Sequence, residues 1–164
     1  MRRDSSWLWI AFGALLLFGG VMVGREVIER IRGIRNHNPG NIERVPGTVW
    51  RGMATDQSSD PRFVVFTAPQ WGIRAMARIL KNYATQGYRS VAQILTRYAP
   101  SIENDTASYI ASVSQRLGVD PRAPLALNDA TLAALVKALI QHENGVQPYS
   151  DDIIQLGINL ERAA

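Results

Sequence analysis

One stretch near the start of the chain constrains its architecture more than any other feature. Residues 7–24 (WLWIAFGALLLFGGVMVG) are 18 consecutive residues without a charged side chain, and no later window of the 164-residue sequence is comparably apolar. As a helix, this run would be about 27 Å long, close to the roughly 30 Å of a bilayer's hydrocarbon core. Trp7 and Trp9 follow Arg2 and Arg3, as is typical of a membrane interface. We therefore expect a transmembrane anchor over residues 1–24.

A cleaved signal peptide is the alternative explanation of the apolar run. Such a peptide has a shorter apolar core and a small-residue cleavage site, which favours the anchor. The run continues into VIERIRGI, where Val27, Ile28 and Ile31 keep helical spacing. This spacing predicts a juxtamembrane helical extension over residues 25–35. Arg residues flank both ends of the run, so charge alone leaves the orientation of the anchor ambiguous.

The remaining residues, 36–164, predict one mainly α domain with a minor β component. An Asn-, Gly- and Pro-rich loop comes first, and two β-prone runs, residues 48–53 and 62–67, predict a small β-hairpin. Helical periodicity follows, with helices expected at residues 69–83, 91–98, 106–117, 130–144 and 151–156. The start signals are Pro69, Ser90, Asn104 or Asp105, Asn128 or Asp129, and Ser150, and the stop signals are Gly118 and Gly145.

Composition excludes several kinds of chemistry. The chain has no Cys and only two His residues, His37 and His142, so a zinc site of the usual ligand types is not expected. No nucleophile elbow or phosphate-binding loop is present, and we expect no metal or other cofactor. The net charge of +4 is small, and nucleic-acid binding is therefore only a third hypothesis, with the Arg residues of 25–35 as its site.

Glu143 is the leading candidate for a catalytic residue. It falls in the last turn of the expected helix 130–144, which is strongly apolar. A carboxylate at a helix C-terminus faces the negative end of the helix dipole, which disfavours the charged form, as a general acid requires. A solvent-facing glutamate at a helix end is the alternative, and the periodicity of the helix alone favours that alternative. Glu103 is the fallback catalytic candidate, although its position also suits the cap of the following helix.

Several motifs together resemble those of a known protein family. These are RGIRNHNPGNIE, VWRG, RFVVFTAPQWGIRAMARIL, YAPSIENDTASYI and HENGVQPYS, which cover residues 32–150 in part. The series resembles a family of phage virion and lysis proteins that are described as structural or lytic-transglycosylase-like. The resemblance implies a lysozyme-like helical domain over residues 36–164.

A more distant similarity is to lysozyme-like glucosaminidases of the flagellar-muramidase type. Those proteins have a helix ending in E-S-G-x-G, then N-x-x-G-I-K, then a W-x-G strand. Here residues 38–42 (NPGNI) and 50–52 (WRG) occur in that order, but no E-S-G precedes them. Residues 138–145 (ALIQHENG) look like that helix end, displaced toward the C-terminus. A circular permutation would place Glu143 beside the Asn-rich loop in space.

The resemblance implies a membrane-anchored enzyme that degrades peptidoglycan, as a lytic transglycosylase or muramidase. A single glutamate, Glu143, would serve as general acid and base. The residues expected to bind the glycan strand are Asn36, Asn38, Asn41, Trp50, Tyr109 and Tyr149. The alternative function is a non-catalytic virion membrane protein that binds peptidoglycan or scaffolds the capsid. We expect the anchor in a host inner membrane or an internal virion membrane, with the domain facing the periplasm, and a role at infection or, as an endolysin, in host lysis.

Overall fold

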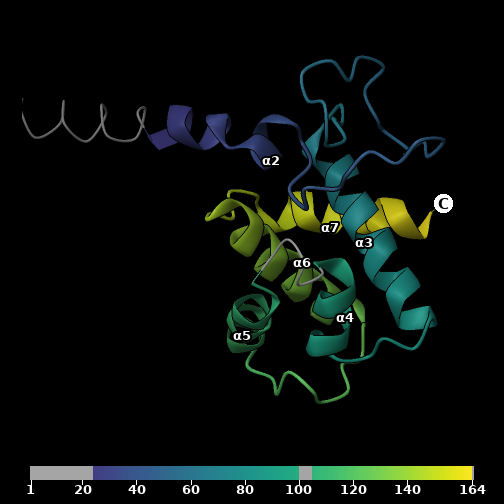
Figure 1. The fold of residues 1–164 in the computed structure, drawn as a ribbon, viewed down its shortest axis with the longest axis vertical. Helices are drawn as coiled ribbons and strands as arrows, with labels where there is room; N and C mark the ends of the chain where they lie inside the picture. Colours follow the sequence, from purple (N-terminus) through teal and green to yellow (C-terminus); the bar gives the residue numbers. More distant parts are fainter. Residues whose placement is uncertain (1–23, 100–104, 164) are drawn as a thin grey trace, which may run out of the picture.

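The computed structural model describes residues 24–99 and 105–163, which fold mainly as helices. In chain order these are α2 (Arg32–Arg35), α3 (Pro69–Thr85), α4 (Val91–Tyr98), α5 (Thr106–Leu117), α6 (Asp129–Asn144) and α7 (Asp151–Arg162) (Figure 1). Residues 24–30 are also helical and lead into α2 through a bend at Ile31. The mainly helical character that the sequence predicts is confirmed.

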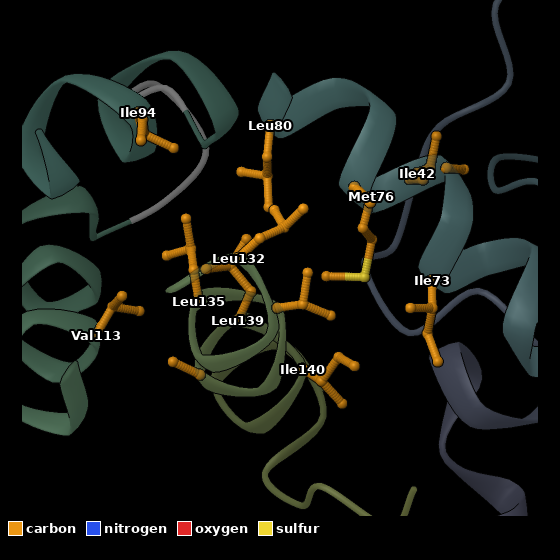
Figure 2. Packing of buried hydrophobic residues seen from close by; sticks show 14 of the residues in the cluster. Ile42, Ile73, Met76, Leu80, Ile94, Val113, Leu132, Leu135, Leu139 and Ile140 are labelled. Atoms are coloured by element: carbon orange, nitrogen blue, oxygen red, sulfur yellow. The ribbon is translucent and has the colours of Figure 1, made fainter. Parts of the chain in front are cut away.

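Helix α6 lies at the centre of the fold and contacts α2, α3, α5 and α7. Its sequence is apolar around most of the helix, which is the pattern of a buried helix. Its buried side chains face those of α3, α4 and α5 in one continuous core (Figure 2). This core fixes the C-terminal end of α6, where Glu143 lies, relative to the rest of the domain.

Local signals set most of the helix ends. The side chains of Ser90, Asp105, Asn128 and Ser150 each accept a hydrogen bond from a backbone N–H in the first turn of α4, α5, α6 and α7. Pro69 begins α3, where its missing N–H costs nothing. Gly118 and Gly145 end α5 and α6 in the left-handed conformation. The predicted start and stop signals are therefore confirmed.

Helix α7 packs along α3 and is longer than predicted, because Gly157 does not end it. Gly157 is buried against α3, and a Cβ at this position would lie 2.5 Å from Ile73 Cγ2 and 2.9 Å from the Gln70 carbonyl oxygen. The glycine thus permits a close approach of two helices. Near the end of α7, the buried carboxylate of Glu161 pairs with Arg78 and Lys81 of α3.

The predicted β-hairpin is wrong, because the two β-prone runs do not pair along their length. In the described residues we find only isolated antiparallel bridges, Glu43 with Phe63 and Met53 with Phe66. The backbone of residues 62–67 is shared between two partners: Val64 N–H donates to Ile42 O, whereas Ala54 N–H donates to Val65 O. A turn at residues 50–53, with Gly52 at φ 78°, separates these partners and prevents a continuous ladder.

The prediction of a membrane anchor also needs correction. Within residues 24–99 and 105–163, none of the helices has the length and apolar character needed to cross a bilayer. The helix of residues 24–30 carries Arg25, Glu26, Glu29 and Arg30, and the predicted span lies outside the described residues except for Gly24. The expected location in a host inner membrane or an internal virion membrane is therefore not supported.

Candidate active site

Glu143 lies in the last turn of α6, and both oxygens of its carboxyl group accept a hydrogen bond. Asn41 Nδ2 donates to Oε2 over 3.0 Å, and the Tyr109 hydroxyl donates to Oε1 over 2.8 Å. The side chain is half-buried. Three segments that are distant in sequence, the Asn-rich loop, α5 and α6, therefore meet at this one carboxyl group. The predicted position of Glu143 beside the Asn-rich loop is confirmed.

Asn41 reaches Glu143 because the loop of residues 36–42 folds back on itself. Asn41 N–H donates to the Asn38 carbonyl oxygen over 3.0 Å, which closes a turn. Its φ of 46° lies in the left-handed region, which Asn adopts more readily than most residues. The turn directs the Asn41 amide toward the end of α6.

Tyr109 holds the other oxygen from a buried position on α5. The side chain is 3% exposed, and its ring stacks on His142 with 3.6 Å between ring centroids. Burial, together with the neighbouring Tyr98 and Glu143, raises the pKa of Tyr109. The hydroxyl therefore stays protonated and serves as a donor to Glu143.

Asn144 ties the end of α6 to the loop from the other side of Glu143. Its Nδ2 donates to the carbonyl oxygens of Pro39 over 2.8 Å and of Ile140 over 2.9 Å. A Cβ on Gly33 of α2 would collide with Asn144 Oδ1 and lie 3.1 Å from Asn41 Oδ1. Only glycine at position 33 leaves room for both asparagine side chains.

A cavity of about 180 Å³ opens beside Glu143. Ile31, Arg32 and Gly33 line one part of it, and Asn41, Phe63, Glu143 and Asn144 complete the lining. Glu143 is the single carboxylate among these residues. The cavity therefore combines one acid, one cation, two amides and two apolar side chains.

The predicted substrate-binding asparagines do not share one role. Asn36 and Asn38 are buried and occupied by the fold: Asn36 Nδ2 donates to Asp60 Oδ2 over 2.8 Å, and Asn38 Nδ2 donates to the Ile42 and Val64 carbonyl oxygens. Asn41 alone of the three lines the cavity. The first two shape the loop, and the third reaches the site.

The predicted aromatic residues also differ in where they lie relative to the cavity. Tyr109 contacts Glu143, whereas Trp50 and Tyr149 pack against the hydrophobic core and do not line the cavity. Burial raises the pKa of Tyr149 to about 12. Glu103, the fallback catalytic residue, lies outside the described residues.

Sequence reasoning missed Asp60, a buried carboxylate that organises the loop behind the cavity. Its oxygens accept hydrogen bonds from the backbone N–H groups of Arg62 and Phe63 and from Asn36 Nδ2. Burial alone would raise its pKa, but these donors and the charge of Arg32 outweigh that effect and lower the pKa to about 2. The signal available in the sequence was an aspartate before Pro61 in a polar turn, which favours this type of side chain–backbone bonding.

No metal site accompanies the cavity in the part of the chain that the structure describes, because no three His, Asp or Glu side chains gather there. The lining offers the carboxyl group of Glu143, which is held by its two donors, Asn41 and Tyr109. Such a group can accept or donate a proton at an atom held in a fixed place.

Comparison with known proteins identifies one phage relative and no matching family model. Protein P5 of Pseudoalteromonas phage PM2 is 41% identical over 153 residues, which are 92% of this chain and 92% of that protein. At this identity and coverage, the two chains correspond over nearly their whole length.

Proposed function

The chain belongs to the family of Protein P5 of Pseudoalteromonas phage PM2, and from this premise we propose that it cleaves peptidoglycan with Glu143 as its single catalytic carboxyl group. The observation that carries the proposal is the meeting of Glu143 with Asn41 and Tyr109 at the edge of a cavity. A carboxyl group held in one orientation, open to a cavity on one side, has the arrangement that glycosidic bond cleavage requires.

The proposed reaction is that of a lytic transglycosylase. The Glu143 carboxyl group donates its proton to the glycosidic oxygen as the C–O bond breaks. The carboxylate then takes the proton of the sugar's own primary hydroxyl group, whose oxygen bonds to the anomeric carbon and forms an anhydro ring. One carboxyl group thus acts as acid and then as base, and no second carboxylate is needed. The lining of the cavity, with its single carboxylate, supports this reaction over a two-carboxylate hydrolysis.

Asn41 and Tyr109 have a positioning role in this scheme. Each occupies one lone-pair direction of the carboxylate, and each oxygen keeps another direction for substrate. Because the Tyr109 ring is buried and stacked on His142, the carboxyl group is held by a rigid partner. A fixed acid needs less reorganisation at the moment of proton transfer.

The proposal is tested by mixing purified cell walls with the full-length chain and following the loss of turbidity. We expect the wild type to clear the walls and Glu143→Gln to lack this activity while keeping the helical circular dichroism of the wild type. The matched control is Glu43→Gln, because Glu43 is exposed, pairs with Arg62 and does not line the cavity. Undiminished clearing by Glu143→Gln would contradict the proposal.

A second candidate function is non-catalytic binding of peptidoglycan. The observation that favours it is that both Glu143 oxygens accept a hydrogen bond from the fold itself, so the carboxylate also has a structural role in tying the loop to α5 and α6. Sedimentation with cell walls distinguishes the two functions. Binding without release of soluble fragments would favour the second candidate.

A further inference from the structure

Arg32 brings a positive charge to the cavity that holds Glu143. It lies in α2 and lines the same cavity as Glu143, Asn41 and Phe63. Its side chain is 60% exposed, so the guanidinium is accessible from solvent. The acid group and the cation are thus presented to one bound molecule.

The Arg32 side chain is held in place from two directions. Its Nε lies 3.6 Å from the buried Asp60 Oδ2, and its Cζ lies 5.3 Å from the centroid of the Phe63 ring. The ion pair uses the Nε edge of the guanidinium. The two terminal nitrogens form the opposite fork, which matches the geometry of a carboxylate.

Two guanidinium groups share one buried carboxylate behind the cavity. Arg35 Nη2 lies 3.7 Å from the same Asp60 oxygen, so two guanidinium groups face one carboxylate. Asp60 also accepts hydrogen bonds from Asn36 and from two backbone N–H groups. Asp60 is thus shared among several donors, and the one carboxylate among the described residues of the cavity lining is Glu143, which the proposed reaction needs in its protonated form. An anion of the substrate would complete the pairing of the two arginines.

We infer that Arg32 binds a carboxylate of the peptidoglycan substrate and thereby positions the glycan strand against Glu143. The inference rests on the proposed function, since it names a specificity residue of the same site. Peptidoglycan carries carboxylates on its stem peptides and, where these have been removed, on the lactyl groups of its sugars. Both sources offer the same bidentate acceptor to the guanidinium.

The test is the affinity of full-length protein for soluble glycan strands, measured in the Glu143→Gln background so that the strands stay intact. Arg32→Met removes the charge and keeps an unbranched side chain, and Arg32→Lys keeps the charge without the fork. Arg35→Met is the matched control, because Arg35 shares Asp60 but does not line the cavity. Each variant is measured with untreated strands and with strands whose carboxylates have been converted to amides.

We expect Arg32→Met to weaken the binding of untreated strands about tenfold, the value of one charge-assisted hydrogen bond. Arg32→Lys should recover part of this loss, and Arg35→Met should bind like the parent. With amidated strands, the parent and Arg32→Met should bind equally weakly. Strands treated with an amidase keep only their lactyl carboxylates and therefore show which carboxylate Arg32 binds. If Arg32→Met still binds these strands more weakly than the parent, the lactyl group is bound; if the two bind equally, the carboxylate of the stem peptide is bound.

Three outcomes would overturn the inference: equal binding of untreated strands by Arg32→Met and the parent, an equal loss in Arg35→Met, or no binding of any strand. The proposed function fails separately. If the chain with Glu143 intact does not cleave cell walls, but binding depends on Arg32, only the catalytic proposal is contradicted. If it cleaves them while Arg32→Met binds as the parent does, only the inference about Arg32 is contradicted.

Discussion

The side-chain amide of Asn41 donates a hydrogen bond to Glu143 Oε2 over 3.0 Å, although the two residues are 102 positions apart in the chain. This contact joins the Asn-rich loop to the end of the central helix. It fixes the carboxyl group relative to a cavity whose lining comes from both segments.

Replacing Asn41 by aspartate tests this contact with little change in shape. The substitution removes the N–H donor to Oε2, so Glu143 loses one of the two groups that hold its orientation. We expect cell-wall clearing at neutral pH to fall at least tenfold. Asn82→Asp, on an exposed position of α3, is the control and should clear walls at the wild-type rate. Equal rates for the two variants would contradict a role for Asn41 in positioning Glu143.

Tyr109→Phe should distinguish the contribution of the Tyr109 hydroxyl group from that of its packed ring. The ring stays packed in the core and stacked on His142, but Glu143 Oε1 loses its donor. Because an intramolecular hydrogen bond contributes about 0.5–1.5 kcal/mol, the free energy of unfolding in urea should fall by an amount in that range. Cell-wall clearing should also decrease. Tyr88→Phe, which keeps the edge contact with Tyr83, should change neither quantity. A Tyr109→Phe protein with wild-type stability and activity would contradict the account.

Gly33→Ala should disturb the site from the α2 side. The new Cβ would collide with Asn144 Oδ1 and press on Asn41 Oδ1, and both side chains flank Glu143. Overpacking of this kind costs about 1–3 kcal/mol of stability. We expect a lower midpoint in thermal unfolding and slower cell-wall clearing. Gly24→Ala, where a Cβ would meet nothing within 4 Å, is the control. If Gly33→Ala has the unfolding midpoint and the clearing rate of this control, the Asn144 and Asn41 side chains can move aside without disturbing the site.

Asp60 predicts a specific dependence of stability on pH. Its folded-state pKa of about 2 lies below the ordinary value of 3.8, so the ionised group stabilises the fold above pH 3.8. This contribution is lost as the pH falls from 3.8 through about 2. Asp60→Asn lacks it, so the difference in free energy of unfolding between wild type and variant should shrink across this window in urea titrations. If the difference in free energy of unfolding between wild type and Asp60→Asn stays constant down to about pH 2, the stabilising role of the Asp60 carboxylate is contradicted.

The helical part of the fold could be predicted because its signals are local. Capping side chains such as Ser90 and Asn128 lie next to the turns that they satisfy, and the apolar spacing of each helix is visible in a short window. The last helix was predicted only over residues 151–156, because the reason it continues through Gly157 lies in another helix, where Ile73 packs against this glycine. The hairpin prediction failed for a similar reason, since residues 62–67 divide their hydrogen bonds between two separate segments.

The candidate site was predictable in part. The helix-end position of Glu143 and the motif order indicated its place beside the Asn-rich loop, and Tyr109 was among the expected aromatic residues. Residue type could not show that Asn36 and Asn38 are buried donors to Asp60 and to backbone carbonyl oxygens, because an asparagine in a loop can bind sugar or backbone equally well. Arg32 lines the cavity from α2, which follows a bend at Ile31 that the regular spacing of residues 25–35 did not indicate.

Proton transfer by Glu143 in cleavage of the glycan strand is the step on which the proposed function depends. The most direct test is mass spectrometry of fragments released from purified cell walls by the wild type and by Glu143→Gln. We expect anhydro-muramyl ends with the wild type and no released fragments with the variant. Reducing ends would contradict the transglycosylase reaction, and release of the same fragments by Glu143→Gln would contradict the assignment of Glu143 itself.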